Sequence, residues 1–148
     1  MESNKQRVVI TGLGITCAIG NNKEEVLKSL YEGKTGVGKI TLFEAEKLTS
    51  DMFGEVKADI PYRVRELDKP SRMEILTDRL IDQLLEDSGI TAEEIDSLDE
   101  RAIMSMATSV GSNTHLIEYT SDIAEGKYIP QRFADYPKYM VKPFQDKL

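Results

Sequence analysis

Among the side chains of this 148-residue chain that could carry covalent or acid–base chemistry, two are the only ones of their kind. Cys17 is the sole cysteine and therefore the only possible thiol nucleophile, and a thiolate activated at a helix N-terminus can accept an acyl group. His115 is the sole histidine. One cysteine excludes an intramolecular disulfide, and these two residues are too few for a cysteine or histidine metal cluster. The sequence predicts neither a metal nor a cofactor.

The positions of both residues favour a structural interpretation. Cys17 closely follows a short apolar run, and a free cysteine is most often a small buried hydrophobe. His115 precedes Leu116 and Ile117 at an expected helix start, where a half-exposed helix residue is commoner than a base or a ligand. We therefore predict no catalytic residue from these two side chains.

Other motifs that resemble sites fail on spacing. Gly12-Leu13-Gly14 suggests a dinucleotide-binding turn, but the third glycine of that pattern is replaced by Cys17, and no Gly-Lys-Ser/Thr phosphate loop is present. Neighbouring acidic residues such as Glu24-Glu25 point in different directions on a helix. No Gly-x-Ser-x-Gly elbow occurs, so a nucleophilic serine is not predicted.

The strands that would position these groups are expected at two short apolar runs. Val8 to Thr11 and Ala102 to Val110 both predict strands buried on both faces, and we expect them to lie in one common sheet. The stretch from Lys34 to Lys57 is irregular and predicts mostly loop, with a possible strand at Phe53 to Val56.

Helix signals lie between and after these runs. The clearest is an apolar stripe of period 3.6 from Met73 to Leu85, which ends at Gly89. Capping patterns at Asn22 and Thr91 predict a short helix and a brief turn. A last helix is expected from Leu116 until Gly126, and the three prolines after Tyr128 predict an irregular tail. The order is that of an α/β fold with a mixed sheet covered by helices.

The chain resembles the N-terminal part of the elongating β-ketoacyl-[acyl carrier protein] synthases. The matching blocks, in order, are Arg7-Val8-Val9-Ile10-Thr11-Gly12-Leu13-Gly14, Gly20, Gly33-Lys34-Thr35-Gly36-Val37, Phe43, Gly54-Glu55-Val56-Lys57, the long helix from Arg72-Met73 to Ser88-Gly89-Ile90, and Ala102 to Gly111. The chain departs from the family pattern at Thr16-Cys17-Ala18 and at Ser112-Asn113.

This resemblance implies a partial thiolase-like fold, in which the first glycines form tight chain turns. It implies that residues 1–126 are the N-terminal part of a synthase domain and that 127–148 form an irregular tail leading toward the catalytic region. The family's nucleophilic cysteine and two catalytic histidines would lie beyond Leu148, so catalytic residues are expected to be absent from this chain. Val110 and Gly111 match a loop near the acyl tail and are the expected substrate-binding residues.

Two functions remain open at this point. The chain is expected to be the N-terminal portion of a condensing enzyme of fatty-acid or polyketide synthesis, an acyltransferase, and not to be catalytic on its own. The alternative is a non-enzymatic interaction module, or an inactive partner subunit built on half a synthase scaffold.

The expected partners follow from the resemblance and the composition. The resemblance implies acyl carrier protein, and either self-association or a complementary synthase subunit. The net charge of −7 weighs against nucleic acid and anionic membrane as partners. The apolar run from Val8 to Ile10 is too short for a signal or a membrane span, and we expect a cytoplasmic protein.

Overall fold

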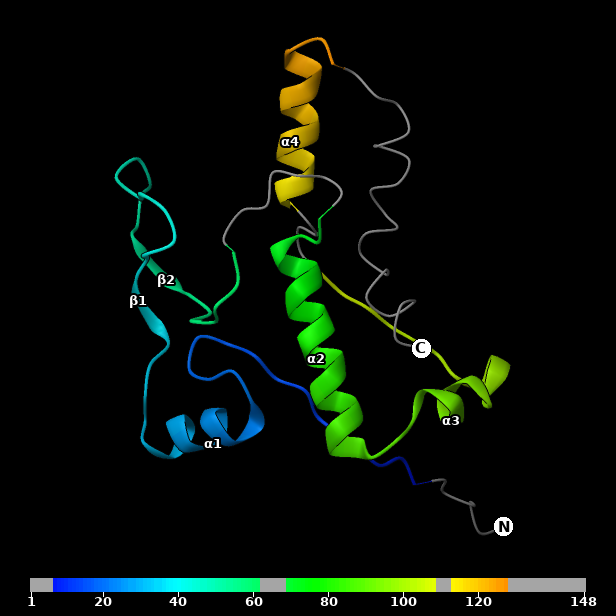
Figure 1. The fold of residues 1–148 in the computed structure, drawn as a ribbon. Coiled ribbons are helices and arrows are strands. Elements are labelled where there is room, and N and C mark those ends of the chain that lie inside the picture. The colour runs from blue at the N-terminus through cyan, green and yellow to red at the C-terminus, as the bar shows by residue number, and fades with distance from the viewer. Residues whose placement is uncertain (1–6, 62–68, 109–112, 128–148) are drawn as a thin grey trace, which may run out of the picture.

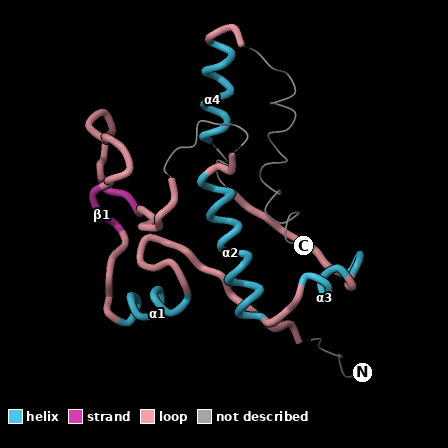
Figure 2. The backbone as a smooth tube through the Cα atoms, viewed as in Figure 1, coloured by secondary structure: helices cyan, strands magenta, loops and turns pink. Residues whose placement is uncertain are grey.

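The computed structural model describes residues 7–61, 69–108 and 113–127. Within them, short helices and one small sheet are joined by long loops (Figures 1 and 2). The elements in chain order are α1 (Lys23–Tyr31), β1 (Val37–Lys39), β2 (Met52–Gly54), α2 (Arg72–Ser88), α3 (Ala92–Asp96), a 3₁₀ turn (Asp99–Arg101) and α4 (Asn113–Ala124).

Helix α2 is the longest element, and it has the boundaries that its sequence predicts. Ser71 is the N-cap, and a complete capping box joins it to Glu74: the Ser71 hydroxyl accepts from the Glu74 N–H at 3.3 Å, and the Glu74 carboxylate accepts from the Ser71 N–H at 2.8 Å. The helix ends at Ser88, and Gly89 caps it with a left-handed φ of 66°, which costs glycine little. Ile81 on the apolar stripe is buried.

The other predicted helices are also confirmed. Asn22 caps α1 by accepting from the Glu25 N–H at 2.9 Å. The capping box at Thr91 starts only the five residues of α3. Helix α4 ends just before Gly126, which has a positive φ of 74°.

The only sheet in the described residues is the antiparallel pair β1 and β2, with Gly38 opposite Phe53. The possible strand predicted at Phe53 to Val56 is thus partly correct, because β2 starts at Met52 and ends at Gly54. An edge-to-face contact of Phe53 with Phe43, ring centroids 6.2 Å apart, packs the connecting loop onto the pair.

The two predicted central strands are wrong in the described part of the chain. Residues 7–16 and 102–108 belong to no strand, and their side chains are largely exposed: Val8 by 96% and Ile103 by 90%. A strand forms by pairing with a neighbouring strand, and neither run pairs with one in the described residues. The expected common sheet is therefore not formed here. Residues 109 and 110 lie outside the described residues.

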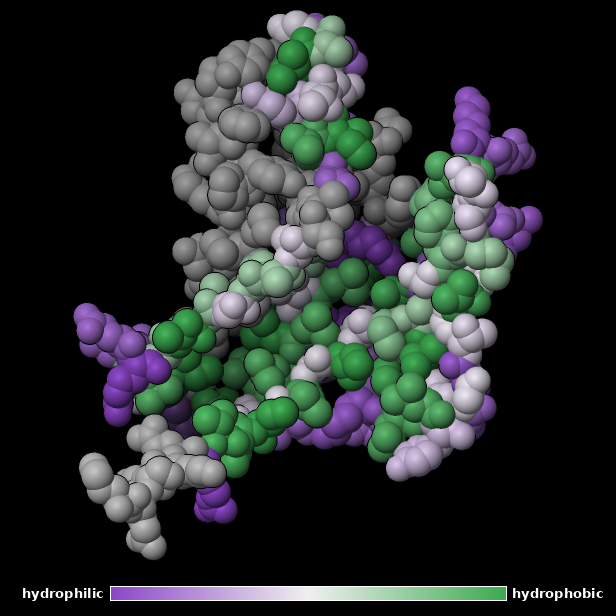
Figure 3. Space-filling view, turned by 180° about the vertical axis from the view of Figure 1, so that it is seen from behind, coloured by the Kyte–Doolittle hydropathy of each residue, from purple (hydrophilic) through white to green (hydrophobic). Residues whose placement is uncertain are grey.

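Many of the buried residues are polar. Ser71 is fully buried and Glu74 is 4% exposed, at the point where α2 begins. Arg72 holds the preceding loop there, because its guanidinium donates to the carbonyl oxygens of Ile60 at 2.6 Å and Val56 at 3.0 Å. Apolar side chains are instead spread over a broad band of one face (Figure 3). No helix in the described residues is long and apolar enough to cross a membrane.

Candidate functional site

The predicted substrate-binding residues, Val110 and Gly111, lie outside the described residues. His115 lies in the first turn of α4, as expected for a residue at a helix start.

Cys17 is half-buried, not buried as predicted. It opens a tight turn with Gly20: the Cys17 N–H donates to the Gly20 carbonyl at 2.8 Å, and the Gly20 N–H donates back at 3.3 Å. Since the turn lies on a loop ahead of α1, the described residues cover the thiol only in part. Cys17 is not at a helix N-terminus, where a thiolate would be stabilised.

Gly12 and Gly14 do not form the tight turns that the resemblance implied. Neither has a positive φ, and the first turn comes later, between Cys17 and Gly20. Instead they let the backbone lie directly on α2. A Cβ added at Gly12 would be 2.8 Å from the Leu84 carbonyl oxygen, and one added at Gly14 would overlap the Leu80 carbonyl oxygen. The glycines are required for close helix packing.

Two polar side chains of α2 bind the same segment, and sequence reasoning missed both. Asp87 accepts from the Leu13 N–H, and the Gln83 amide oxygen accepts from the Ile15 N–H, each at 2.9 Å. Asp87 also forms an ion pair with Lys23, which with the Leu13 hydrogen bond holds the Asp87 pKa below its usual value. The sequence shows only that Gln83 and Asp87 are polar residues four apart on a helix, beside an apolar stripe, and this pattern does not indicate what they bind.

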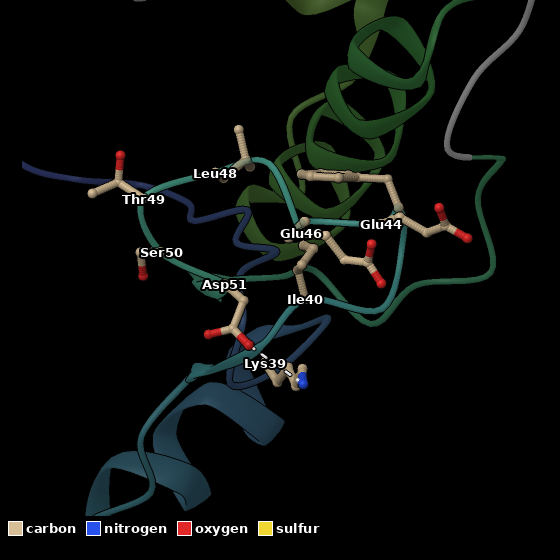
Figure 4. A pocket seen from close by; sticks show the side chains of 10 residues that line it. Lys39, Ile40, Glu44, Glu46, Leu48, Thr49, Ser50 and Asp51 are labelled. Atoms are coloured by element: carbon tan, nitrogen blue, oxygen red, sulfur yellow. Dashed lines mark ion pairs between the residues drawn. The ribbon is translucent and has the colours of Figure 1, made fainter.

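A surface pocket of about 460 Å³ lies within the loop that joins β1 to β2 (Figure 4). Its wall includes the ion pair of Lys39 with Asp51, whose charged atoms are 3.4 Å apart. Thr49 and Ser50 contribute hydroxyls, but neither a cysteine nor a histidine lines the pocket to activate them. The described residues also hold no cluster of three metal-ligating side chains.

Comparison with known proteins identifies the family of this chain. The family described as beta-ketoacyl synthase, N-terminal domain, matches residues 5–136. A 3-oxoacyl-[acyl-carrier-protein] synthase 1 of Haemophilus influenzae is 34% identical over 95 residues, 61% of this chain and 23% of its own length. A 3-oxoacyl-[acyl-carrier-protein] synthase 2 of Coxiella burnetii is 33% identical over 93 residues, 61% of this chain and 22% of its own.

A shorter match is closer in sequence. A 3-oxoacyl-[acyl-carrier-protein] synthase 1 of Buchnera aphidicola subsp. Baizongia pistaciae is 50% identical over 54 residues, 36% of this chain. The chain spans 13 to 23% of the length of these three relatives.

The fold agrees with this assignment. The structure of the ishigamide ketosynthase/chain length factor superposes with a TM-score of 0.56 over 84% of this chain and 32% of that one, at 22% sequence identity. Kinship does not depend on the common sheet that we expected, because the family match extends along the sequence through both apolar runs. The chain belongs to the beta-ketoacyl synthase family and corresponds to its N-terminal domain.

Proposed function

We propose that this chain is the N-terminal portion of a β-ketoacyl-[acyl carrier protein] synthase, which supports decarboxylative condensation in fatty-acid or polyketide synthesis and is not catalytic on its own. The family match over residues 5–136 carries the proposal. The whole enzyme would transfer an acyl group to a cysteine and join it to the carbanion left when a malonyl unit loses CO₂. This chain would supply part of the structural framework of that enzyme.

The exposed apolar runs support a scaffold role. Val8, Ile10 and Ile103 are each at least 82% exposed although their side chains are typical of buried strands. Such exposure costs free energy in water, and a partner or a further stretch of fold that covers these side chains would recover it. Acyl carrier protein and a complementary synthase polypeptide are the partners that we propose, and Val110 with Gly111 would line the acyl pocket. We place the protein in the cytoplasm.

Complementation tests this function. The chain is co-expressed with a polypeptide that carries the part of the Haemophilus influenzae relative beyond the matched region, and the purified mixture receives acyl- and malonyl-loaded carrier protein. We expect mass spectrometry to detect a β-ketoacyl product from the pair and none from either polypeptide alone. A second test is Val9→Asp, which places a charge on an exposed apolar run and should reduce the yield of this product.

The outcomes separate the two candidate functions. Condensation by the pair supports the proposal. A stable complex with no product, in which the downstream polypeptide still accepts an acyl group, would instead indicate an inactive partner subunit. Condensation by this chain alone would contradict the assignment of scaffold.

A further inference from the structure

The chain from Gly12 to Ile15 is bound to α2 at a matched spacing. Leu13 and Ile15 donate their N–H groups to Asp87 and Gln83, which are four residues apart. Four residues of α-helix rise about 6 Å, and two residues of extended chain span about 6.6 Å. The acceptors on α2 are therefore in step with alternate residues of the segment, which runs antiparallel to the helix.

The two glycines that alternate with these residues, Gly12 and Gly14, follow the same spacing. A Cβ at Gly12 would lie 2.9 Å from the Ser88 nitrogen, and a Cβ at Gly14 would lie 3.3 Å from the Leu84 nitrogen. Each residue from Gly12 to Ile15 thus has a defined contact on α2, either a hydrogen bond or a close backbone approach. A slip by one residue would bring a side chain against the helix backbone.

Both acceptors are themselves held in place. Lys23 pairs with Asp87, and the Gln83 side-chain nitrogen donates to the Asn21 carbonyl at 2.8 Å. These anchors come from the chain just beyond the bound segment, where it enters α1. The two side chains that bind the segment are therefore themselves held by Lys23 and Asn21.

The residues immediately before this segment are exposed and strand-forming. Val8, Val9 and Ile10 are 96%, 72% and 82% exposed, and no charged residue occurs from Val8 to Asn22. Because side chains alternate along an extended chain, the register fixed at Gly12 to Ile15 sets which of them face each side.

We propose that Gln83 and Asp87 form a register clamp, which holds residues 12–15 on α2 and presents Val8 to Thr11 as a strand ready to enter a sheet. Val8 and Ile10 would face one side of that sheet, and Val9 and Thr11 the other. The clamp is a property of this chain alone. Only the use of the presented strand rests on the proposed function.

Amide hydrogen exchange in the ¹⁵N-labelled chain tests the clamp residue by residue. Gln83→Ala should raise exchange at Ile15 roughly tenfold, the loss of about one hydrogen bond, with little change at Leu13. Asp87→Ala should show the reverse pattern. Glu86→Ala, an exposed neighbour on the same helix, is the matched control and should change neither. Gln83→Glu keeps an acceptor oxygen and should preserve protection at Ile15.

Selectivity separates a clamp from a general role in stability. If each alanine variant accelerates Leu13, Ile15 and the α2 amides together, the clamp is wrong. Should a variant not fold, the wild-type chain decides: exchange of Leu13 and Ile15 at free-peptide rates overturns the proposal. If exchange is selective but complementation fails, the proposed function is contradicted and the clamp stands. If complementation succeeds but exchange is not selective, the clamp is contradicted and the proposed function stands.

Discussion

Glu55 accepts two hydrogen bonds from Thr41, one from its backbone N–H and one from its hydroxyl, each at 2.7 Å. The Glu55 side chain is 5% exposed, and Lys57 donates to it at 3.0 Å. These contacts close the loop between the two strands at its base. The Thr41 N–H bond first, and then the Thr41 hydroxyl and Lys57, lower the Glu55 pKa from 4.5 to about 2.

Acid should therefore open this loop only at very low pH. Because the folded-state pKa is below the unfolded one, Glu55 contributes stability above pH 4.5, and the contribution is lost as pH falls from 4.5 toward 2. We expect the Thr41 amide resonance to titrate with a midpoint near 2. Glu55→Gln is the control and should abolish the titration. A midpoint near 4.5 would show that the carboxylate is not held by Thr41.

Gly14→Ala should destabilise the packing of the N-terminal segment on α2. The added methyl would overlap the Leu80 carbonyl oxygen, and overpacking of this kind costs about 1–3 kcal/mol. Gly38→Ala is the matched control, because nothing lies within 4 Å of its added Cβ. Urea unfolding followed by circular dichroism compares the two. Equal free energies of unfolding would refute the close approach.

Cys17 should not become acylated. It is half-buried in a turn and does not lie at a helix N-terminus, so nothing described activates its thiolate. Incubation with acyl-carrier thioester followed by intact mass spectrometry should show the unmodified chain. The control is Cys17→Ser, which measures any acylation that does not involve the Cys17 thiol. An adduct present in the wild type and absent from this variant would make Cys17 a nucleophile.

The isolated chain should self-associate through its exposed apolar runs. Unpaired strand-forming segments are templates for other chains, and Ile103 is 90% exposed within an uncharged run. Light scattering should report a mass above the monomer's. Val9→Asp together with Ile103→Asp should lower it, whereas Tyr31→Asp, also at an exposed residue, should not. A stable monomer would show that these runs do not drive self-association.

The helices could be predicted because their signals are local. Ser71 and Glu74 are three residues apart, and Gly89 follows directly on the stripe that it terminates. Strand formation depends instead on a partner strand, which can lie far away in the sequence. The run from Val8 to Thr11 has the composition of a strand, but the partner strand that would pair with it is absent from the described residues.

The register in which the N-terminal segment packs on α2 could not be predicted from the sequence either. The sequence shows Gly12 and Gly14 as glycines after an apolar run, which equally suits a turn, a phosphate site or close packing. Choosing among these requires knowing that Gln83 and Asp87, about 70 residues later, approach them. The family resemblance identified the scaffold without that knowledge, because it rests on ordered blocks along the whole match.

The polar character of the interior has a thermodynamic consequence. Only three apolar residues are buried in the described part of the chain, against four polar or charged ones: Val26, Ile60 and Ile81, against Ser29, Glu55, Ser71 and Glu74. Heat-capacity change and denaturant sensitivity both scale with the apolar surface that unfolding transfers to water. The isolated chain should therefore melt gradually, over a wide temperature range and with a shallow urea slope.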